Sequence, residues 1–233
     1  MPITNNNNNT PSSARLRTHV DYFISQGVGI LQAPATLPFL PPSRQGSDQL
    51  SSSAGSEGVF VSRDRLFKHL LDNERAIPHY IGFCADPFRD PCPPAGGFPD
   101  LPFIAKSITL VLELRDGLRG FNGTVHGGLT CAIMDEAMGT LLFQNDLLGR
   151  EAEAKGLVPA GAAAKGRFPA AVTAEMNVRY RRPLPTPQIV LVTASLERVE
   201  GRKTHMRVVV EDKEGREYAS CTGTFIALAS TKL

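Results

Sequence analysis

Residues 127–143 have the sequence GGLTCAIMDEAMGTLLF, and this segment decides the fold of the chain. Its composition and spacing predict a helix. Apolar side chains lie around nearly the whole circumference of that helix: Leu129, Cys131, Ile133, Met134, Met138, Leu141, Leu142 and Phe143. A helix that is apolar on every side is buried in the protein interior. We therefore expect the remaining elements to surround it.

Segments with strand character flank this helix on both sides in the sequence. One precedes the helix, at residues 104–114, and four follow it, at residues 172–181, 189–199, 203–211 and 218–228. In the third of these four, apolar and polar residues alternate as in a half-buried strand. The short connections predict antiparallel neighbours. A curved antiparallel sheet wrapped around one long helix is the simplest packing, and it gives an α+β fold.

The regions before and after this helix differ in composition. Residues 1–57 contain Asn-rich, Pro-rich and Ser-rich runs, which predict a flexible low-complexity segment in which residues 20–30 can form a short element folded onto the domain. Residues 58–103 predict a short amphipathic helix and a proline-rich, irregular lead-in. Residues 104–233 form the expected compact domain, in which the Ala- and Gly-rich residues 144–170 are expected to be a loop.

Charge and cysteine usage exclude several classes of protein. A formal net charge of +2 provides no strong field for a nucleic-acid partner. The four cysteines include no CxxC pair, so we expect a reducing compartment and neither a disulfide framework nor a metal site. No apolar run reaches the roughly 18 residues of a membrane helix, so we expect no membrane span.

These features favour a cytoplasmic protein, with two alternatives left open. The N-terminus has no apolar signal-peptide core, but Arg15 and Arg17 precede the first acid, Asp21, which gives it a faint mitochondrial transit-peptide character. The chain ends with Thr231-Lys232-Leu233, which differs by one residue from a peroxisomal targeting tripeptide.

Two adjacent acids, Asp135 and Glu136, lie within the apolar helix. Neighbouring helical residues point roughly 100° apart, so the two carboxylates face different surroundings. A buried carboxylate costs several kcal/mol unless it is paired or its pKa shifts, so its presence requires an explanation. One explanation is a general base or nucleophile. The other is an acid that reaches solvent or accepts a backbone hydrogen bond, and the pattern alone leaves both open.

The segment His126-Gly127-Gly128 lies where a glycine-rich loop meets the start of the predicted helix. The first turn of a helix presents free N–H groups and a partial positive charge. Two glycines allow a substrate carbonyl to approach that backbone closely, as an oxyanion hole requires. The alternative is that the glycines only permit a tight turn and that His126 caps the helix.

Asp135 follows His126 by nine residues. On an ideal helix this separation amounts to roughly 900° of rotation and about 13 Å of rise. The two groups would then face opposite sides of the helix, too far apart to act on one carbonyl. If both are catalytic, each serves a site that another subunit completes. This predicts a symmetric homodimer, or a tetramer of such dimers, with composite active sites at the interface.

The chain resembles the hot-dog-fold thioesterases of the phenylacetate-degradation and acyl-CoA thioesterase type. The resemblance covers roughly residues 104–228. It is carried by TVHGGLT at residues 124–130, Met134-Asp135, VTAEMNVRYRRP at residues 172–183, the turn with Asp212 and Gly215, and residues 219–225. The resemblance implies the hot-dog fold and thioester hydrolysis with no metal or organic cofactor.

The resemblance also implies roles for individual residues. The backbone N–H of Gly128 would be the oxyanion donor, with Gly127 beside it in substrate binding. His126 would orient or polarise the thioester. Asp135 would activate water as a general base, or attack as a nucleophile, and Thr173 would supply a hydroxyl near the attacking water.

One position departs from the family pattern. Several relatives carry Asn or Gln six residues before the histidine, where this chain has Gly120. Asn122, four residues before the histidine, is the candidate substitute in substrate binding. Glu136 has no counterpart with a catalytic role, so we expect it to be structural.

Binding of CoA phosphates would require cations. Arg179 and Arg181 share one strand face and are the first candidates. Arg182 and the Arg202-Lys203 pair are further candidates, and a solvated basic edge is the alternative for each of them.

The expected function is hydrolysis of an acyl thioester carried by CoA or by an acyl carrier protein, in fatty-acyl or specialised polyketide metabolism. A hydratase or dehydratase of the same fold is disfavoured, because those enzymes place an Asp a few residues before a His. A non-catalytic acyl-thioester-binding protein is the other alternative, and Gly120 favours it.

Overall fold

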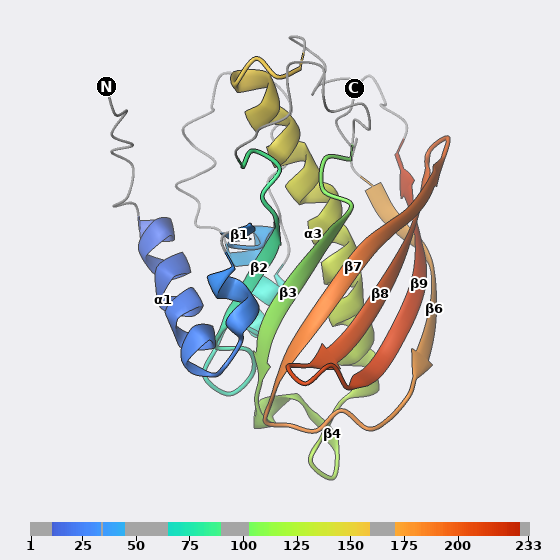
Figure 1. Ribbon diagram of the computed structural model, residues 1–233. Coiled ribbons are helices and arrows are strands. Elements are labelled where there is room, and N and C mark those ends of the chain that lie inside the picture. Colours follow the sequence, from blue (N-terminus) through green and yellow to red (C-terminus); the bar gives the residue numbers. More distant parts are fainter. Residues whose placement is uncertain (1–10, 34, 45–64, 90–102, 159–170, 229–233) are drawn as a thin grey trace.

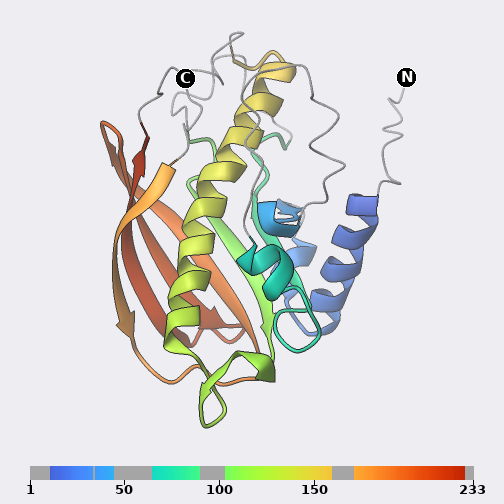
Figure 2. The same cartoon turned by 180° about the vertical axis from the view of Figure 1, so that it is seen from behind.

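The computed structural model of the protein describes residues 11–33, 35–44, 65–89, 103–158 and 171–228. Within these residues, seven strands form one antiparallel sheet in the order β1-β2-β3-β7-β8-β9-β6. The sheet curves around the long helix α3 (Gly127–Ala154), which runs diagonally across one face of it (Figure 1, Figure 2). The expected α+β architecture, a curved antiparallel sheet wrapped around one long helix, is confirmed.

The order of the strands differs from the expectation at one position. The strands are β1 (Thr36–Phe39), β2 (Tyr80–Ala85), β3 (Ser107–Leu114), β6 (Ala171–Tyr180), β7 (Gln188–Glu200), β8 (Lys203–Asp212) and β9 (Glu217–Ala227). The short connections predict a meander of four strands in chain order, and β7, β8 and β9 follow it, but β6 pairs with β9 at the edge of the sheet. The prediction that β6 and β7 are neighbours is wrong, because residues 181–187 carry the chain past the meander. Contacts between β6 and α3, which loop length does not reveal, fix β6 at this edge.

The main core fills the space between α3 and the concave face of the sheet. Met134, Met138 and Leu141 of α3 have no exposed surface. At Gly223 of β9, a Cβ atom would lie 2.5 Å from the sulfur of Met138, so the helix and the sheet approach closely there. The side of α3 that faces the sheet is therefore buried, whereas Leu129, Cys131 and Phe143 elsewhere on the helix are only partly buried. Burial on every side, which the apolar circumference predicts, is not reached among the described residues.

Helix α1 (Pro11–Ser25) covers part of the opposite, convex face of the sheet, beside β2 and β3 (Figure 1). Phe23 of α1 is completely buried in a second cluster that includes Val111 of β3. The neighbours of Val111 in β3, Leu110 and Leu112, point into the main core instead. This half of the sheet is thus buried on both faces.

The N-terminal regions contain more regular structure than the sequence predicts. Among the described residues of the 1–57 segment, expected to be flexible, are α1 and β1, whose apolar side chains find partners in β2 and β3. The 58–103 lead-in contains β2, and its expected helix is a single π turn at Leu66–Leu70. Local composition does not show these contacts, because the partners lie far apart in the sequence.

Helix α3 also extends beyond the predicted end at Phe143, into the region expected to be a loop. Leu148 and Ala152 are buried in this second half, and the buried Asn145 side chain bonds to both backbone groups of Ala105. The rest of that predicted loop, from residue 159, and the C-terminal tripeptide lie outside the described residues. Among the described helices, none is both long enough and apolar enough to cross a membrane.

Asp212 organises the turn between β8 and β9. Its carboxylate is buried and accepts hydrogen bonds from the backbone N–H groups of Glu214 and Arg216 and from the Tyr218 hydroxyl. Burial alone would raise the pKa of Asp212, but the bonds from Arg216 and Tyr218 and the nearby Arg216 charge outweigh it and hold the pKa below its usual value.

Replacement of this residue, Asp212→Ala, should lower the free energy of unfolding by about 2 kcal/mol at neutral pH, because it leaves the buried Tyr218 hydroxyl without its acceptor. Folding lowers the pKa of Asp212, so its stabilisation is complete above the unfolded value of about 4 and is lost as the pH falls through the depressed folded value. Urea unfolding of both proteins at pH 7 and at pH values below 4 measures this difference. An equal difference at both pH values would contradict the assignment.

Candidate active site

The first turn of α3 brings the His-Gly-Gly segment to the surface, beside the small hairpin β4 (Arg119–Phe121) and β5 (Thr124–Val125). His126 is the N-cap of the helix, and its Nδ1 accepts a hydrogen bond from the N–H of Gly128 at 3.0 Å. Because Nδ1 is an acceptor, the proton of the neutral imidazole lies on Nε2. Nε2–H is therefore the donor that His126 can offer to a carbonyl oxygen.

This bond involves the Gly128 amide, which the family resemblance assigns to the oxyanion hole. The N–H of Gly128 is already bonded to the imidazole in this conformation. The N–H of Gly127 has no acceptor among the described residues, as is usual for the first turn of a helix. The helix N-terminus thus offers Gly127 N–H directly, and Gly128 N–H only once the imidazole moves away.

Asp135 lies two turns further along α3 and faces β6. Its Oδ1 accepts a hydrogen bond from the Thr173 hydroxyl at 2.6 Å. No donor among the described residues bonds to Oδ2 of Asp135. The pKa of the buried Cys221 thiol is raised to about 11, first by burial and then by Cys131 and Asp135, which places all three groups near one another.

Tyr180 and Cys131 form a contact that residue types and the family resemblance do not predict. The Tyr180 hydroxyl donates to the carbonyl oxygen of Gly127 at 2.8 Å and lies 2.9 Å from Sγ of Cys131. Burial and the hydrogen bond with Cys131 raise the pKa of Tyr180 to about 12, which keeps the phenol protonated. The four-residue spacing of Gly127, Cys131 and Asp135 places them on one helix face, and this was the available signal.

Glu136 lies in different surroundings from Asp135, as the helix geometry predicts. Its Oε1 accepts hydrogen bonds from the hydroxyls of Ser43, at 2.7 Å, and Tyr80, at 3.2 Å. Both donors are buried. Glu136 therefore links α3 to β2 and to the short turn Pro42–Arg44, in agreement with a structural role.

The hairpin before His126 explains why the chain has Gly120 where the family pattern has Asn or Gln. Asn122 and Gly123 form its two-residue turn with φ values of 26° and 72°, and Asn-Gly is the favoured pair for such turns. The Asn122 side chain is exposed and bonds to none of the described residues. At Gly120, a Cβ atom would lie 2.7 Å from Cα of His126. The loop therefore leaves no room for a side chain where several relatives carry Asn or Gln.

His126 and Asp135 lie in different surroundings within one chain. The His126 imidazole packs against Gly120, whereas Asp135 packs against β6. Among the described residues, no hydrogen bond or ion pair links the two side chains, and no group of three or more His, Cys, Asp or Glu is arranged to hold a metal ion.

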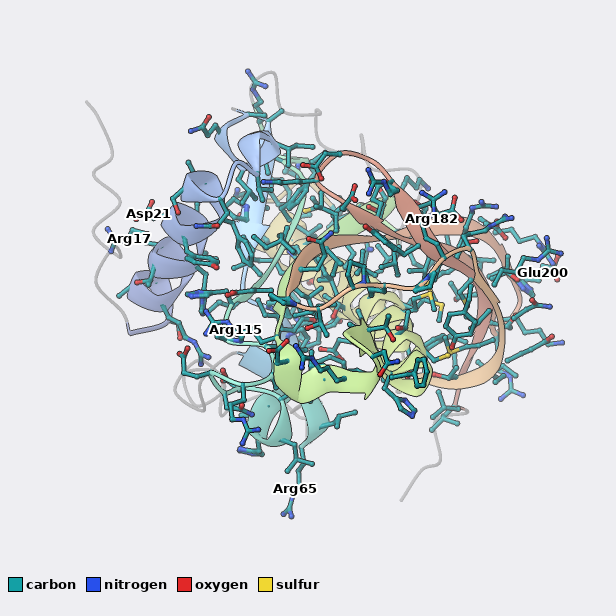
Figure 3. The ribbon with its side chains drawn as sticks, turned by 90° about the horizontal axis from the view of Figure 1, so that it is seen from below. Arg17, Asp21, Arg65, Arg115, Arg182 and Glu200 are labelled. Carbon is teal, nitrogen blue, oxygen red and sulfur yellow. The ribbon has the colours of Figure 1, made fainter. Side chains whose placement is uncertain are left out.

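A pocket of about 390 Å³ lies beside the first turn of α3. Gly127, Tyr180, Arg181 and Arg182 are among the residues that line it. Figure 3 shows Arg182 on the side of the molecule away from α1. Two of the predicted phosphate-binding candidates thus lie near the His-Gly-Gly turn.

A second pocket, of about 220 Å³, contains Arg179 and Arg181. The two arginines share one face of β6, as the period of a strand predicts. That face is the convex one: Arg179 pairs in register with Ser220, whereas the neighbouring Val178 pairs with the buried Cys221. Arg179 therefore lies on the opposite face of the sheet from Asp135, and the structure does not bring these two site candidates together.

Comparison with known families identifies the central part of the chain. Residues 122–219 match the family model of the thioesterase superfamily. This region is a thioesterase-superfamily domain. It has the hot-dog fold, and it includes α3 with His126 and Asp135, together with β6, β7 and β8.

The thioesterase-superfamily domain also resembles individual proteins. The chain is 28% identical over 192 residues to Verlamelin biosynthesis protein B of Lecanicillium sp, covering 77% of this chain and 76% of that protein. It is 28% identical over 116 residues to Acyl-coenzyme A thioesterase THEM4 of Mus musculus, covering 49% of this chain. This match spans 40% of the mouse protein's length.

Solved structures with a similar domain include a mutant of the phenylacetic acid degradation protein PaaI from Thermus thermophilus. It is 26% identical and has a TM-score of 0.39, over 53% of this chain and 86% of that one. Another is the BH2602 protein from Bacillus halodurans with CoA, which is 24% identical with a TM-score of 0.38, over 52% of this chain and 66% of that one.

The close approach at Gly120 generates a prediction. The substitution Gly120→Ala should lower the free energy of unfolding by about 1–3 kcal/mol, because the added methyl group forces the loop or His126 to move. Gly139→Ala in α3 is the matched control, since a Cβ atom there meets no atom within 4 Å. The control should be neutral or stabilising by up to about 1 kcal/mol. Urea unfolding compares the two, and a Gly120→Ala protein as stable as the control would contradict the proposed fit.

Proposed function

We propose that the protein hydrolyses acyl thioesters to a free acid and a thiol. The observation that carries this proposal is the hydrogen bond from Thr173 of β6 to Asp135 of α3. The N-terminus of the same helix presents His126 and the N–H of Gly127, which bonds to no acceptor among the described residues. A carboxylate can accept a proton from water, and helix N–H groups can stabilise the oxyanion that forms on the thioester carbonyl. This chemistry requires no metal or organic cofactor.

The division of roles follows from the hydrogen bonds. The Thr173 hydroxyl holds Oδ1 of Asp135, which leaves Oδ2 to bind and deprotonate the attacking water. The Nε2–H of His126 and the N–H of Gly127 can donate to the carbonyl oxygen. A substrate that displaces the imidazole from Gly128 would gain that amide as a further donor. Direct attack by Asp135 as a nucleophile uses the same groups.

The thiol part of the substrate is proposed to be CoA or the phosphopantetheine arm of a carrier protein. The pocket beside the first turn of α3, with Arg181 and Arg182 in its wall, supports a thioester that carries phosphate groups. The names of two relatives, an acyl-coenzyme A thioesterase and a verlamelin biosynthesis protein, support acyl-CoA chemistry and a role in specialised biosynthesis respectively.

We further propose that two copies of the chain form composite sites, in which His126 of one copy faces Asp135 of the other. One chain alone leaves His126 and Asp135 in separate surroundings. Among the described strands, β6 lies at the edge of the sheet, and its Val172 and Tyr180 side chains are 47% and 55% exposed. An unpaired edge with exposed apolar side chains is a natural site for pairing with a second copy.

A non-catalytic thioester-binding protein is the second candidate. It is favoured by the hairpin geometry, because Gly120 excludes the Asn or Gln side chain that several relatives carry at that position. Binding would use the same first turn of α3 without the hydrolytic step.

The substitution Asp135→Asn should lower kcat by about 100-fold or more, because it removes the general base while keeping the size of the side chain. Thiol release from a panel of short, long and aromatic acyl-CoAs measures the effect. Glu136→Gln is the matched control: it neutralises the adjacent carboxylate but keeps an acceptor for Ser43 and Tyr80, so it should retain most of the activity.

Hydrolysis at the wild-type rate by Asp135→Asn would show that the catalytic assignment is wrong. If neither protein hydrolyses any thioester, including those on a loaded carrier protein, but both bind acyl-CoA, the binding role is supported instead.

A further inference from the structure

The pocket on the convex face of the sheet gathers three arginines from two strands that are not neighbours. Arg179 and Arg181 belong to β6 and its C-terminal end, and Arg207 belongs to β8, with β9 between the two strands. In register, Arg207 pairs with Thr222 of β9, and Thr222 pairs with Asn177 of β6. All of these side chains therefore project from the same face of the sheet.

The distance between β6 and β8 leaves room for a small anion between the arginines of the two strands. Neighbouring strands lie about 4.8 Å apart, so β6 and β8 are separated by about 10 Å. Arginine side chains that extend from both strands can converge over β9 on one small anion placed between them. The other residues that line the pocket are Asn177 of β6 and Ser220, Cys221 and Thr222 of β9. The hydroxyl groups of Ser220 and Thr222 and the Asn177 amide can donate hydrogen bonds.

The charge of this pocket is largely uncompensated. Arg181 forms an ion pair with Glu217 at 3.3 Å. Among the described residues, neither Arg179 nor Arg207 has a carboxylate within ion-pair distance. Glu175 is exposed on the same face of β6 but does not line the pocket. Like charges held close together favour an anionic ligand, and guanidinium groups bind phosphate oxygens in bidentate fashion.

We propose that this pocket is a binding site for a phosphate group, on the face of the sheet opposite to Asp135. A volume of about 220 Å³ is sufficient for a phosphate group but not for a whole nucleotide, so the rest of the ligand extends into solvent. The phosphate can belong to the CoA part of the thioester, reaching over the edge of the sheet at β6, or to a separate phosphate-bearing molecule. The site itself does not depend on the proposed hydrolysis, since binding is measurable without turnover.

Isothermal titration with adenosine 3′,5′-bisphosphate tests the site, with inorganic phosphate as a competitor and adenosine as the uncharged comparison. The double variant Arg179→Gln/Arg207→Gln should bind the bisphosphate at least about tenfold more weakly than wild type, because two charge-assisted contacts are removed. The charge-matched control is Arg65→Gln/Arg75→Gln, which removes two exposed arginines of the lead-in segment (Figure 3 shows Arg65) and should bind like wild type.

Equal affinity of the wild type and the Arg179→Gln/Arg207→Gln variant would overturn the proposal, as would an equal loss in the control.

If the affinity difference is found, kinetics identify the source of the phosphate. A KM that rises for acyl-CoA but not for an acyl-N-acetylcysteamine thioester, which lacks phosphate, assigns the pocket to the substrate's CoA part. Unchanged KM values for both, with phosphate binding lost, assign it to a separate ligand. A wild type that binds the bisphosphate but hydrolyses no thioester would refute the proposed function and leave the phosphate site standing.

Discussion

Helix α3 carries apolar side chains on nearly all sides, and each large one contributes about 1.5–3 kcal/mol when it is removed from water. A single flat layer cannot cover such a helix, so the sheet has to curve around it. Met138 against Gly223 shows how closely the two are fitted. The edge strand β6 extends this cover along the first half of α3, where Tyr180 and Thr173 bond to the helix. The position of β6, and with it the site, follows from this packing of the sheet around α3.

The packing of α3 against neighbouring segments also partly buries its two carboxylates, Asp135 and Glu136. Each carboxylate needs hydrogen-bond donors, because removing a charged group from water without a partner costs free energy. Glu136 accepts from two buried hydroxyls and links three segments. Asp135 accepts from one hydroxyl and keeps an oxygen that no described residue bonds to. The two acids therefore differ in how many hydrogen bonds they can still accept. Asp135 has an oxygen available for a water molecule, and this makes it the candidate for chemistry.

Much of the fold could be predicted because it depends on local periodicity. The spacing of apolar residues within one segment is enough to predict α3, and likewise β3 and each of the strands β7, β8 and β9. The position of β6 and the docking of α1 could not be predicted, since they depend on packing between segments far apart in the sequence, such as the cluster that contains Phe23 of α1 and Val111 of β3. At the site, the family resemblance singled out Asp135 and Thr173 separately, and the structure joins them by a hydrogen bond. The bond between His126 and the Gly128 amide could not be predicted, because side-chain rotamers leave no trace in residue spacing.

The composite site is the central claim, because it explains how His126 and Asp135 can act together although one chain keeps them apart. Co-expression of His126→Ala and Asp135→Asn chains, each inactive alone, tests it directly through thiol release by the mixed protein. If His126 of one copy serves Asp135 of the other, every mixed dimer contains one intact site, and an equal mixture recovers about a quarter of wild-type activity. If both residues serve a site within one chain, every site carries a substitution, and the mixture stays as inactive as its parents; that result would contradict the account.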